Sequence, residues 1–352
     1  MKQKSSTIQE IIREAKKGKM FILVDNKDRE NEGDLVVPAS KVNAKKINFM
    51  AKHGRGLICL ALTQEKVKKL KLSLMSLINK SRTQTAFTVS IEAKKGISTG
   101  ISAHDRSKTI RVAIKNKSNN KDIVSPGHVF PLVSKNGGVL ERAGHTEASV
   151  DISKLAKLNP SAVICEVMNE DGTMARYNDL VPFSKKHRLK IAKIEDLISY
   201  RLKNEKLIKI ISNKKIHIKK YGNFEMKTFK NKLDGVEHYA LTSGKINYSK
   251  TPRVRVISTN ILNSFLNFKK NNFKASLNYL TKFNNFALIL VKGTNNLKSS
   301  QENNNILRYY GVGAQIIKEL GIRNMILVSR SKKRIIALKG YGIKIKKQEI
   351  IK

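Results

Sequence analysis

An acidic segment between two apolar runs constrains this chain more than any other sequence feature. Residues 25–34 carry five carboxylates, although the whole chain has only 27 acidic residues against 70 basic ones. Apolar runs precede the segment at 21–24 and follow it at 35–38, which predicts a strand, an acidic loop and a second strand. Carboxylates this close repel one another unless a cation or a basic group lies among them. The loop is therefore either a solvated acidic turn or a binding site for a cation.

Alternating apolar runs and helical patterns predict an α/β (α+β) fold in both halves of the chain. The length of 352 residues suits about two domains. The composition shifts near residue 200, where a lysine-rich stretch begins, and we place the boundary between domains 1–203 and 204–352. An amphipathic helix is expected within 1–19, where Ser6 and Gln9 could form a capping box. Further strands are expected at 56–62, 87–92, 162–167, 207–211, 287–291 and 325–328, and further helices at 105–113, 147–155 and 313–320.

The composition argues against several classes of protein. A formal net charge of +43 invites a nucleic-acid interpretation, but the excess is mostly lysine spread along the chain, so we expect no specific nucleic acid and only weak, salt-sensitive adhesion to polyanions. Cys59 and Cys165 have no nearby partner with CxxC spacing. This excludes a structural zinc site built on cysteine and makes a disulfide framework unlikely. No apolar run is long enough to span a bilayer. We expect a cytoplasmic protein with no signal peptide and no membrane partner.

Three other places in the first half combine histidine, arginine and acidic residues. His128 and His145 each follow a glycine, which lets a ligand approach the backbone closely. Residues 142–146 offer a guanidinium, a hydroxyl and successive backbone N–H groups just before an expected helix, which suits a phosphate. Glu166 ends an expected strand and is followed by the polar stretch 169–175. A lone Gly-His pair is more often a turn with an exposed imidazole, but four unusual segments in one domain favour a shared site.

Six motifs in the first half follow one another in a fixed order. They are DRENEGDL (28–35), TAFTVSIEA (85–93), TGISAHDR (99–106), PGHVFPL (126–132), GGVLERAGHTEA (137–148) and DGTMAR (171–176). Together they make residues 1–200 resemble the 3,4-dihydroxy-2-butanone 4-phosphate synthase family. The resemblance implies conversion of D-ribulose 5-phosphate into L-3,4-dihydroxy-2-butanone 4-phosphate and formate in riboflavin biosynthesis. It also implies a requirement for Mg²⁺ or Mn²⁺ and a homodimer.

The resemblance further implies roles for individual residues. Glu30 and His145 would hold the metal, and His128 and Glu166 would be essential for proton transfer. A divalent ion suits this chemistry because it would stabilise the enediolate that forms when a proton leaves the carbon beside a carbonyl. Oxygen ligands and one imidazole are compatible with Mg²⁺ or Mn²⁺. The substrate-binding residues would be Arg29, Glu30, Asp34, Arg142, Ala143, Gly144, His145, Thr146 and Glu166.

Two details of this half concern residues beside the implied site. On an extended loop Glu30, Glu32 and Asp34 would point the same way, so Glu32 could contact a second ion or an ordered water. Cys59 could be read as a nucleophile. A buried strand residue is favoured instead, because no step of the reaction requires a thiol.

The second half carries a different set of motifs, with losses. DGVEHYAL (234–241), RVRV (253–256), YGVGAQII (310–317), GIR (321–323) and GYGI (340–343) make residues 224–352 resemble the GTP cyclohydrolase II family. Active members bind zinc through three cysteines, whereas residues 258–286 here contain none. VKGTNN (291–296) and SRSK (329–332) replace the family's Arg-Gln-Glu-Gly-Arg-Gly and Thr-Asn-Asn-Pro segments. We therefore expect a cyclohydrolase-like α/β domain without zinc and without GTP chemistry.

Three alternatives remain at this stage. The chain could be a bifunctional enzyme that also hydrolyses GTP, which the missing cysteines argue against. The second half could instead be a non-catalytic interaction module. A polyanion-binding protein is the third alternative, and it would be recognised by binding that depends on salt and not on nucleic-acid sequence.

Overall fold

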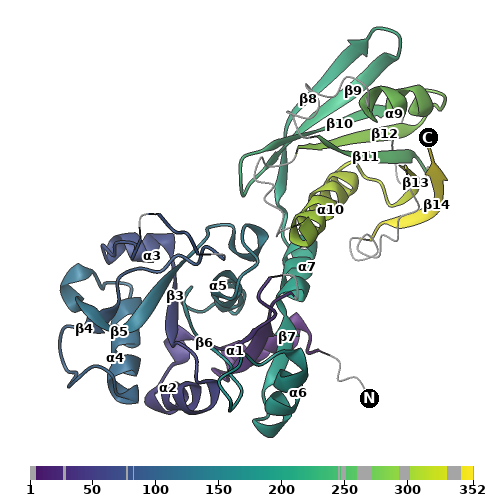
Figure 1. Ribbon diagram of the computed structural model, residues 1–352. Helices are drawn as coiled ribbons and strands as arrows, with labels where there is room; N and C mark the ends of the chain where they lie inside the picture. The colour runs from purple at the N-terminus through teal and green to yellow at the C-terminus, as the bar shows by residue number, and fades with distance from the viewer. Residues whose placement is uncertain are drawn as a thin grey trace. The chain divides into compact units, whose positions relative to one another are not determined.

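The computed structural model describes residues 5–26, 29–76, 78–81, 83–244, 246, 251–259, 272–292, 302–330 and 342–351 of the chain. It divides into two compact units, Met1–Ile198 and Ser199–Lys352, and each contains its own sheet (Figure 1). The predicted boundary at residue 203 falls within helix α7 (Ile194–Asn204) and stays a prediction. Some residues used in the sequence analysis lie outside the described residues, namely Lys27, Asp28, 260–271, 293–296, Ser331, Lys332, 340 and 341.

The first unit is built on a seven-stranded mixed sheet in the order β4-β5-β3-β6-β2-β1-β7. Its strands are β1 (Phe21–Val24), β2 (Gly33–Pro38), β3 (Cys59–Thr63), β4 (Ile91–Ala93), β5 (Ile123–Ser134), β6 (Ala162–Glu166) and β7 (Lys190–Lys193). Helix α7 crosses the division between the units. The first unit's other helices are α1 (Ile8–Lys16), α2 (Ala44–Phe49), α3 (Gln64–Lys69), α4 (Ala103–Ile114), α5 (His145–Leu155) and α6 (Tyr177–Lys186), with shorter helical segments η1 (Ala39–Lys41), η2 (Met50–Gly54), η3 (Asn120–Asp122) and η4 (Gly138–Leu140). The antiparallel pair β1 and β2 confirms the predicted strand, acidic loop and strand.

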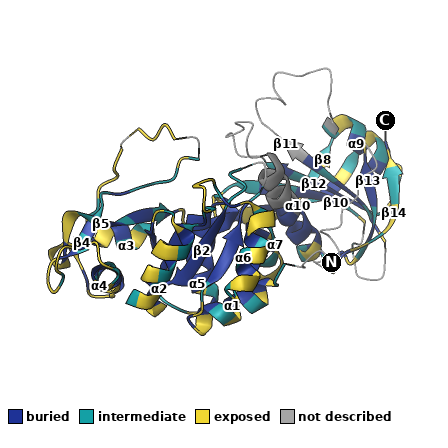
Figure 2. Ribbon diagram, turned by 60° about the horizontal axis from the view of Figure 1, so that its bottom comes forward, coloured by how far each residue is buried: buried dark blue, intermediate teal, exposed yellow. Residues whose placement is uncertain are grey.

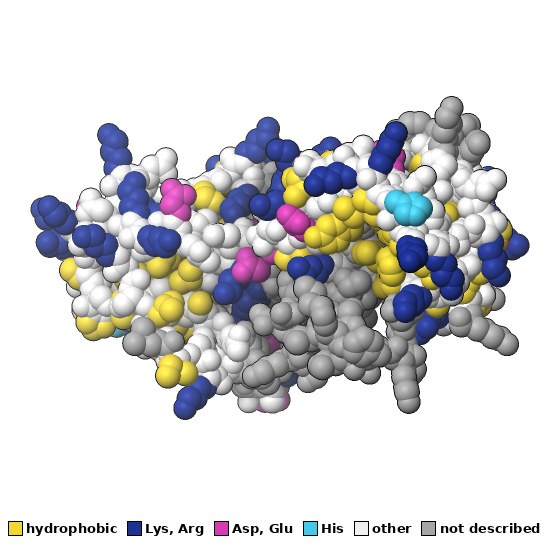
Figure 3. Space-filling view, turned by 90° about the horizontal axis from the view of Figure 1, so that it is seen from above, with side chains coloured by type: hydrophobic (Ala, Val, Ile, Leu, Met, Phe, Trp, Pro, Cys, Tyr) yellow, Lys and Arg dark blue, Asp and Glu magenta, His cyan; other side chains and the backbone are white. Residues whose placement is uncertain are grey.

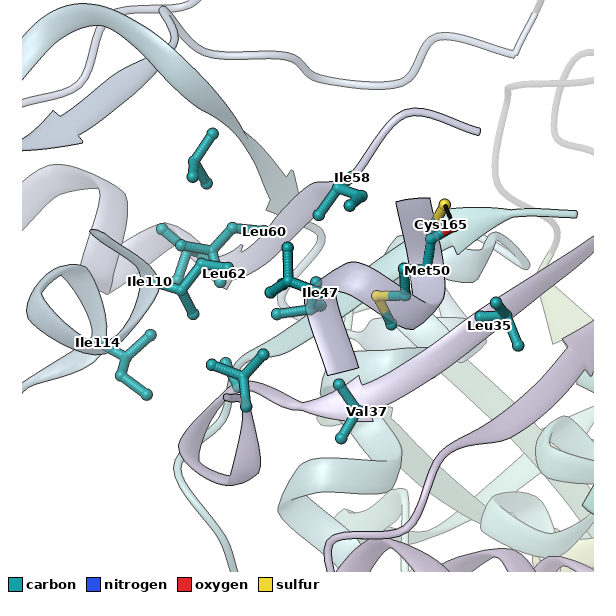
Figure 4. Packing of buried hydrophobic residues seen from close by; sticks show 14 of the residues in the cluster. Leu35, Val37, Ile47, Met50, Ile58, Leu60, Leu62, Ile110, Ile114 and Cys165 are labelled. Atoms are coloured by element: carbon teal, nitrogen blue, oxygen red, sulfur yellow. Dashed lines mark hydrogen bonds between the residues drawn. The ribbon is translucent and has the colours of Figure 1, made fainter. Parts of the chain in front are cut away.

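Helices cover both faces of this sheet, which explains why its strands are continuous apolar runs. Every residue of β1 and β2 is buried (Figure 2). On one face, Leu35 and Val37 of β2 pack with Ile47 and Met50, and Cys165 lies beside Met50 (Figure 4). On the other face, α5 packs against β2, β3 and β6. Helix α5 is buried along nearly its whole length, and it carries His145 at its first position.

Two local predictions in the first unit need correction. The capping box forms one residue later than expected, between Thr7 and Glu10, because the Ser6 N–H donates to the carbonyl of Ile191 (2.8 Å). The strand expected at 87–92 is reduced to β4, with only isolated bridges at Phe87 and Thr88. Its pairing with β5 jumps from Ile91–Val129 to Glu92–Val124, so a bulge interrupts the ladder.

The second unit has a seven-stranded sheet in the order β14-β13-β11-β12-β10-β9-β8. The strands are β8 (Ile208–Ile218), β9 (Gly222–Asn231), β10 (Glu237–Ser243), β11 (Arg253–Thr259), β12 (Phe286–Lys292), β13 (Asn324–Ser329) and β14 (Lys344–Ile350), and the helices are α9 (Asn272–Leu280) and α10 (Glu302–Glu319). The predicted strands at 287–291 and 325–328 are confirmed. The predicted strand at 207–211 is too short because β8 pairs with β9 along its length, and the predicted helix at 313–320 begins earlier, at Glu302.

The surviving motif 310–317 has a structural role in the second unit. The Gln315 amide nitrogen donates to the carbonyls of Leu202 (2.8 Å) and Glu205 (2.8 Å), and its oxygen accepts from the Leu207 N–H (2.9 Å). These bonds satisfy backbone groups at the end of α7 and before β8, which would otherwise be unpaired. The motif therefore serves the fold, whether or not the domain binds a nucleotide.

The predicted α/β class is confirmed in both units. Among the described residues, no helix has the length and apolar content needed to cross a membrane. On the face drawn in Figure 3, lysine and arginine side chains are scattered and do not gather in one patch.

Candidate active site

The ends of β1, β2 and β6 meet the first turn of α5 at one edge of the first unit's sheet. Asp34 in β2 pairs with Leu23 in β1 and with Glu166 in β6. The His145 ring nitrogen Nε2 lies 3.2 Å from the Leu23 carbonyl oxygen, and Asp25 follows β1 directly. The sheet register thus brings the acidic loop together with His145 and Glu166, each of which follows the loop by more than one hundred residues.

Asp25, Glu30 and His145 form a group that could hold a metal ion, with one potential ligand atom from each lying within 4.8 Å of the others. Because a carbonyl oxygen only accepts, Nε2 of His145 carries the proton and Nδ1 is left as the lone-pair atom. That nitrogen lies 4.0 Å from Glu30 Oε2 and 3.7 Å from Asp34 Oδ1. Burial lowers the pKa of His145, which keeps the ring neutral. A neutral imidazole fixed through its other nitrogen is typical of a metal ligand.

The Asp25 carboxylate also organises the acidic loop. It accepts from Arg29 (2.8 Å) and from the backbone N–H groups of Glu30 (3.2 Å) and Glu32 (2.9 Å). Its side chain is 1 % exposed. Arg29 pairs with Glu30 as well, so one guanidinium neutralises part of the loop's charge. The loop is therefore ordered by its own hydrogen bonds and ion pairs and is not a solvated acidic turn.

The acidic loop is not extended, which corrects the expectation that Glu30, Glu32 and Asp34 share one side by alternation. Asn31 adopts a left-handed backbone with φ of 56° and breaks the alternation. The Arg176 guanidinium donates to the carbonyls of Glu30 (2.6 Å) and Asn31 (2.9 Å), so it fixes this turn from the other end of the unit's sequence.

One buried and one partly buried carboxyl complete this edge of the sheet, Asp34 and Glu166. Asp34 is 3 % exposed, and its Oδ1 has no hydrogen-bond partner among the described residues. Burial first, and the neighbouring Glu166 next, raise the pKa of Asp34 well above its usual range. Burial also raises the pKa of Glu166, whose Oε2 accepts from the Leu57 N–H (2.8 Å). A Cβ on Gly56 would lie 2.5 Å from that oxygen, so the glycine permits this close approach.

Replacing the buried carboxyl in Asp34→Asn is expected to stabilise the metal-free protein at neutral pH. Because the pKa of Asp34 is higher in the folded protein than in the unfolded chain, protonated Asp34 favours folding below the unfolded-state pKa, near pH 4. This contribution to stability is lost as the pH rises through the folded-state pKa. Ionised Asp34 therefore costs stability at neutral pH, and we expect a gain of about 0.5–2 kcal/mol in the variant at pH 8. Urea unfolding in a chelator at pH 4 and pH 8 measures it. A variant less stable than wild type at pH 8 would contradict the electrostatic account.

The segment 142–146 lies at the start of α5, but its arginine is already engaged. The Arg142 guanidinium donates to Glu147 (2.6 Å), to the Thr83 carbonyl (3.0 Å) and to the Thr85 hydroxyl (2.9 Å). The backbone N–H groups of the helix start remain a suitable anion site. No feature of the sequence predicts this ion pair between Arg142 and Glu147. The other members of the segment, Ala143, Gly144, His145 and Thr146, are buried.

His128 lies on β5, apart from the metal-binding group. Cys59 of β3 pairs with Ile164 of β6 and with Phe130 of β5, so Glu166 and His128 each lie two residues beyond these pairs at the same edge. Two strand spacings, about 10 Å, separate their positions. The His128 side chain is 44 % exposed, and Nδ1 bonds to Glu92 Oε1 of β4.

The model of the 3,4-dihydroxy-2-butanone 4-phosphate synthase family matches residues 9–200. The chain belongs to this family. The model of the GTP cyclohydrolase II family matches residues 209–285 and 274–350. Two curated relatives cover nearly the whole chain. The "Riboflavin biosynthesis protein RibBA" of Aquifex aeolicus is 43% identical over 99% of this chain and 93% of its own. The "3,4-dihydroxy-2-butanone 4-phosphate synthase" of Photobacterium phosphoreum is 43% identical over 97% of this chain and 98% of its own.

Two solved synthase structures agree with this assignment. The crystal structure of RibBX, a two-domain 3,4-dihydroxy-2-butanone 4-phosphate synthase from A. baumannii, has a TM-score of 0.86 and 40% identity and covers 98% of this chain and 99% of its own. A synthase structure in complex with two magnesium ions has a TM-score of 0.54 and 37% identity, and covers 56% of this chain and 98% of its own.

Two residues of the candidate site were missed by sequence reasoning. Asp25 was counted among the acidic residues but not as a potential ligand, although a carboxylate directly after a buried strand is a usable signal. Arg176 was only part of a motif, and no local signal shows that it reaches the acidic loop. Cys59 is buried in β3 as predicted, and burial raises the pKa of its thiol, so it stays protonated and a poor nucleophile.

Proposed function

We propose that the first unit converts D-ribulose 5-phosphate into L-3,4-dihydroxy-2-butanone 4-phosphate and formate. The observation that carries the proposal is the buried His145 ring, whose Nδ1 faces the carboxylate of Glu30 (4.0 Å) at the sheet edge. Family membership supports the same reaction. The substrate is a sugar phosphate, and the product supplies riboflavin biosynthesis.

The donor set fits Mg²⁺ or Mn²⁺. Glu30 and His145 would be ligands, as first expected, and Asp25 would be a third. Carboxylate oxygens and one imidazole suit these ions, and the unpaired Asp34 Oδ1 beside them suits a substrate hydroxyl or a water. The synthase with two magnesium ions supports this choice of metal. When bound, the ion would act as a Lewis acid on substrate oxygens.

Protein groups would supply binding and proton transfer. Arg29, Asp34 and the segment 142–146 would bind the substrate, the last through the N–H groups at the start of α5. Glu166 would hold a proton on the oxygen that does not accept from Leu57, because burial raises its pKa. His128 would exchange a proton at Nε2.

The assembly is proposed to be a homodimer in the cytoplasm. Apolar side chains that are exposed in the single chain support the dimer: Leu57, Leu74, Met75, Ile78, Ile101 and Val124. Sedimentation velocity that gives only the mass of one chain at micromolar concentration would contradict it.

The second unit is proposed to lack both zinc and GTP chemistry. The sequence contains two cysteines, and both lie in the first unit, buried as Cys59 and Cys165. Three thiolates are needed for the family's zinc site, so no zinc-activated water is available for hydrolysis. Gln315 shows that a retained motif can be explained by the fold alone.

One experiment tests both units. Purified full-length protein should release formate from ribulose 5-phosphate with Mg²⁺ or Mn²⁺, should release none from GTP, and should contain no stoichiometric zinc by metal analysis. No formate from ribulose 5-phosphate with either ion would contradict the synthase assignment. About one zinc per chain, or formate from GTP, would instead favour the bifunctional alternative.

A further inference from the structure

We propose that Glu92 is a positioning residue that fixes the tautomer and orientation of the His128 ring. The proposal rests on the proposed role of His128 in proton transfer. Glu92 Oε1 bonds to His128 Nδ1. An ionised carboxylate only accepts hydrogen bonds, so in the neutral ring Nδ1 carries the proton and Nε2 keeps the lone pair. That is the form of imidazole that can remove a proton from a substrate.

The backbone presents His128 on a bulge beside Glu92. Pairing between β4 and β5 passes from Ile91–Val129 directly to Glu92–Val124, so residues 125–128 are extra on β5. Bulges of this kind re-aim side chains and are common beside active sites. A Cβ at Gly127 would overlap the backbone of Ile91 and the Glu92 side chain, so only glycine lets the bulge lie this close to the carboxylate.

A loop closes over the two side chains from the other side. Gly100 has φ of +85°, and a Cβ there would overlap the Glu92 carboxylate and lie 2.8 Å from His128 Nδ1. Asp105, at the start of α4, holds this loop through the Ser98 hydroxyl (2.8 Å) and the Gly100 N–H (3.1 Å). The Glu92 side chain is 16 % exposed, whereas that of His128 is 44 % exposed. The carboxylate is enclosed while the imidazole stays open to a substrate.

An ion pair with a purely structural role would not need this arrangement. The strength of such a pair would not depend on which ring nitrogen carries the proton. Its loss would change the stability of the protein and not the tautomer of the ring. The two steric restrictions, at Gly100 and at Gly127 within the bulge, instead converge on the bond between Glu92 and Nδ1. A carboxylate that orients a catalytic histidine through its second nitrogen is a recurrent arrangement in enzymes.

The test is Glu92→Gln in the full chain, with Glu195→Gln as a matched control on an exposed pair with Lys193. We expect Glu92→Gln to lower kcat by about 10²-fold or more with KM within a few-fold, because general base catalysis contributes about 10²–10⁴. Glu92→Asp keeps the carboxylate and should lose less. Nitrogen-15 NMR of the ring should show His128 protonated at Nδ1 in wild type and a mixed tautomer in Glu92→Gln.

A double variant separates positioning from an independent effect. If Glu92 acts through His128, Glu92→Gln combined with His128→Ala should be no slower than His128→Ala alone. Full additivity, or a Glu92→Gln protein with wild-type kcat and wild-type ring signals, would overturn the inference while leaving the proposed function intact. Wild-type turnover in His128→Ala would instead contradict the proposed role of His128. Circular dichroism and thermal melts check that each variant is folded.

Discussion

Glu30→Gln and His145→Ala are each expected to lower formate release by about 10³-fold while the protein stays folded. Lewis-acid stabilisation contributes several kcal/mol to a transition state, and each 1.4 kcal/mol corresponds to a tenfold change in rate. Losing one of three potential ligands, Asp25, Glu30 and His145, leaves too little affinity to keep a weakly held divalent ion in place. Formate release measured across a Mg²⁺ titration, with Mn²⁺ binding followed by electron paramagnetic resonance, tests the expectation.

The matched control for Glu30→Gln is Glu14→Gln. Glu14 lies on the first helix and contacts Lys19 at 3.8 Å, with the lysine largely exposed, so the same change of chemistry there should leave turnover unaltered. Near wild-type turnover of either ligand variant at limiting Mg²⁺ would show that the metal is held elsewhere.

Arg142→Ala is expected to raise the KM for ribulose 5-phosphate by about 10- to 100-fold, since a hydrogen bond to a charged group contributes about 1.5–3 kcal/mol. The increase should exceed that of Asp34→Asn. The structure adds a second effect, because Glu147 is 1 % exposed and loses its guanidinium partner at 2.6 Å. Breaking a buried pair on one side typically costs about 3–5 kcal/mol of folding stability. Steady-state kinetics and chemical denaturation measure the two effects separately.

Arg142→Lys distinguishes binding from stability. A lysine keeps a positive charge beside Glu147, so we expect most of the stability to return, while a bidentate contact with phosphate is lost. An Arg142→Lys protein with wild-type stability and wild-type KM would mean that Arg142 supports α5 and that the phosphate is bound elsewhere. A raised KM in Arg142→Lys, with stability retained, would place the guanidinium at the phosphate.

The chemistry of the site could largely be predicted from the sequence. The acidic loop lies between two apolar runs, and strands β1 and β2 form where those runs predict them, because a short apolar run bounded by a polar turn is a local signal along the chain. Glu30 and His145 could be proposed from ordered motifs. The missing cysteines of the second half are a matter of composition, so the proposal that this half lacks zinc chemistry rests on the sequence alone.

Tertiary structure alone decided which groups meet and how they are paired. Leu23 and His145 are 122 residues apart and yet share a hydrogen bond that sets the imidazole tautomer. Arg176 donates a hydrogen bond to the carbonyl of Glu30, 146 residues earlier in the acidic loop. The left-handed backbone of Asn31 removes the alternation of side chains that an extended loop would have. Contacts of this kind depend on sheet register and helix placement, which no local pattern encodes. The sequence by itself therefore determined the residue types of the site, whereas long-range packing decided the pairing of His145 with Leu23, of Arg176 with the acidic loop and of Glu92 with His128.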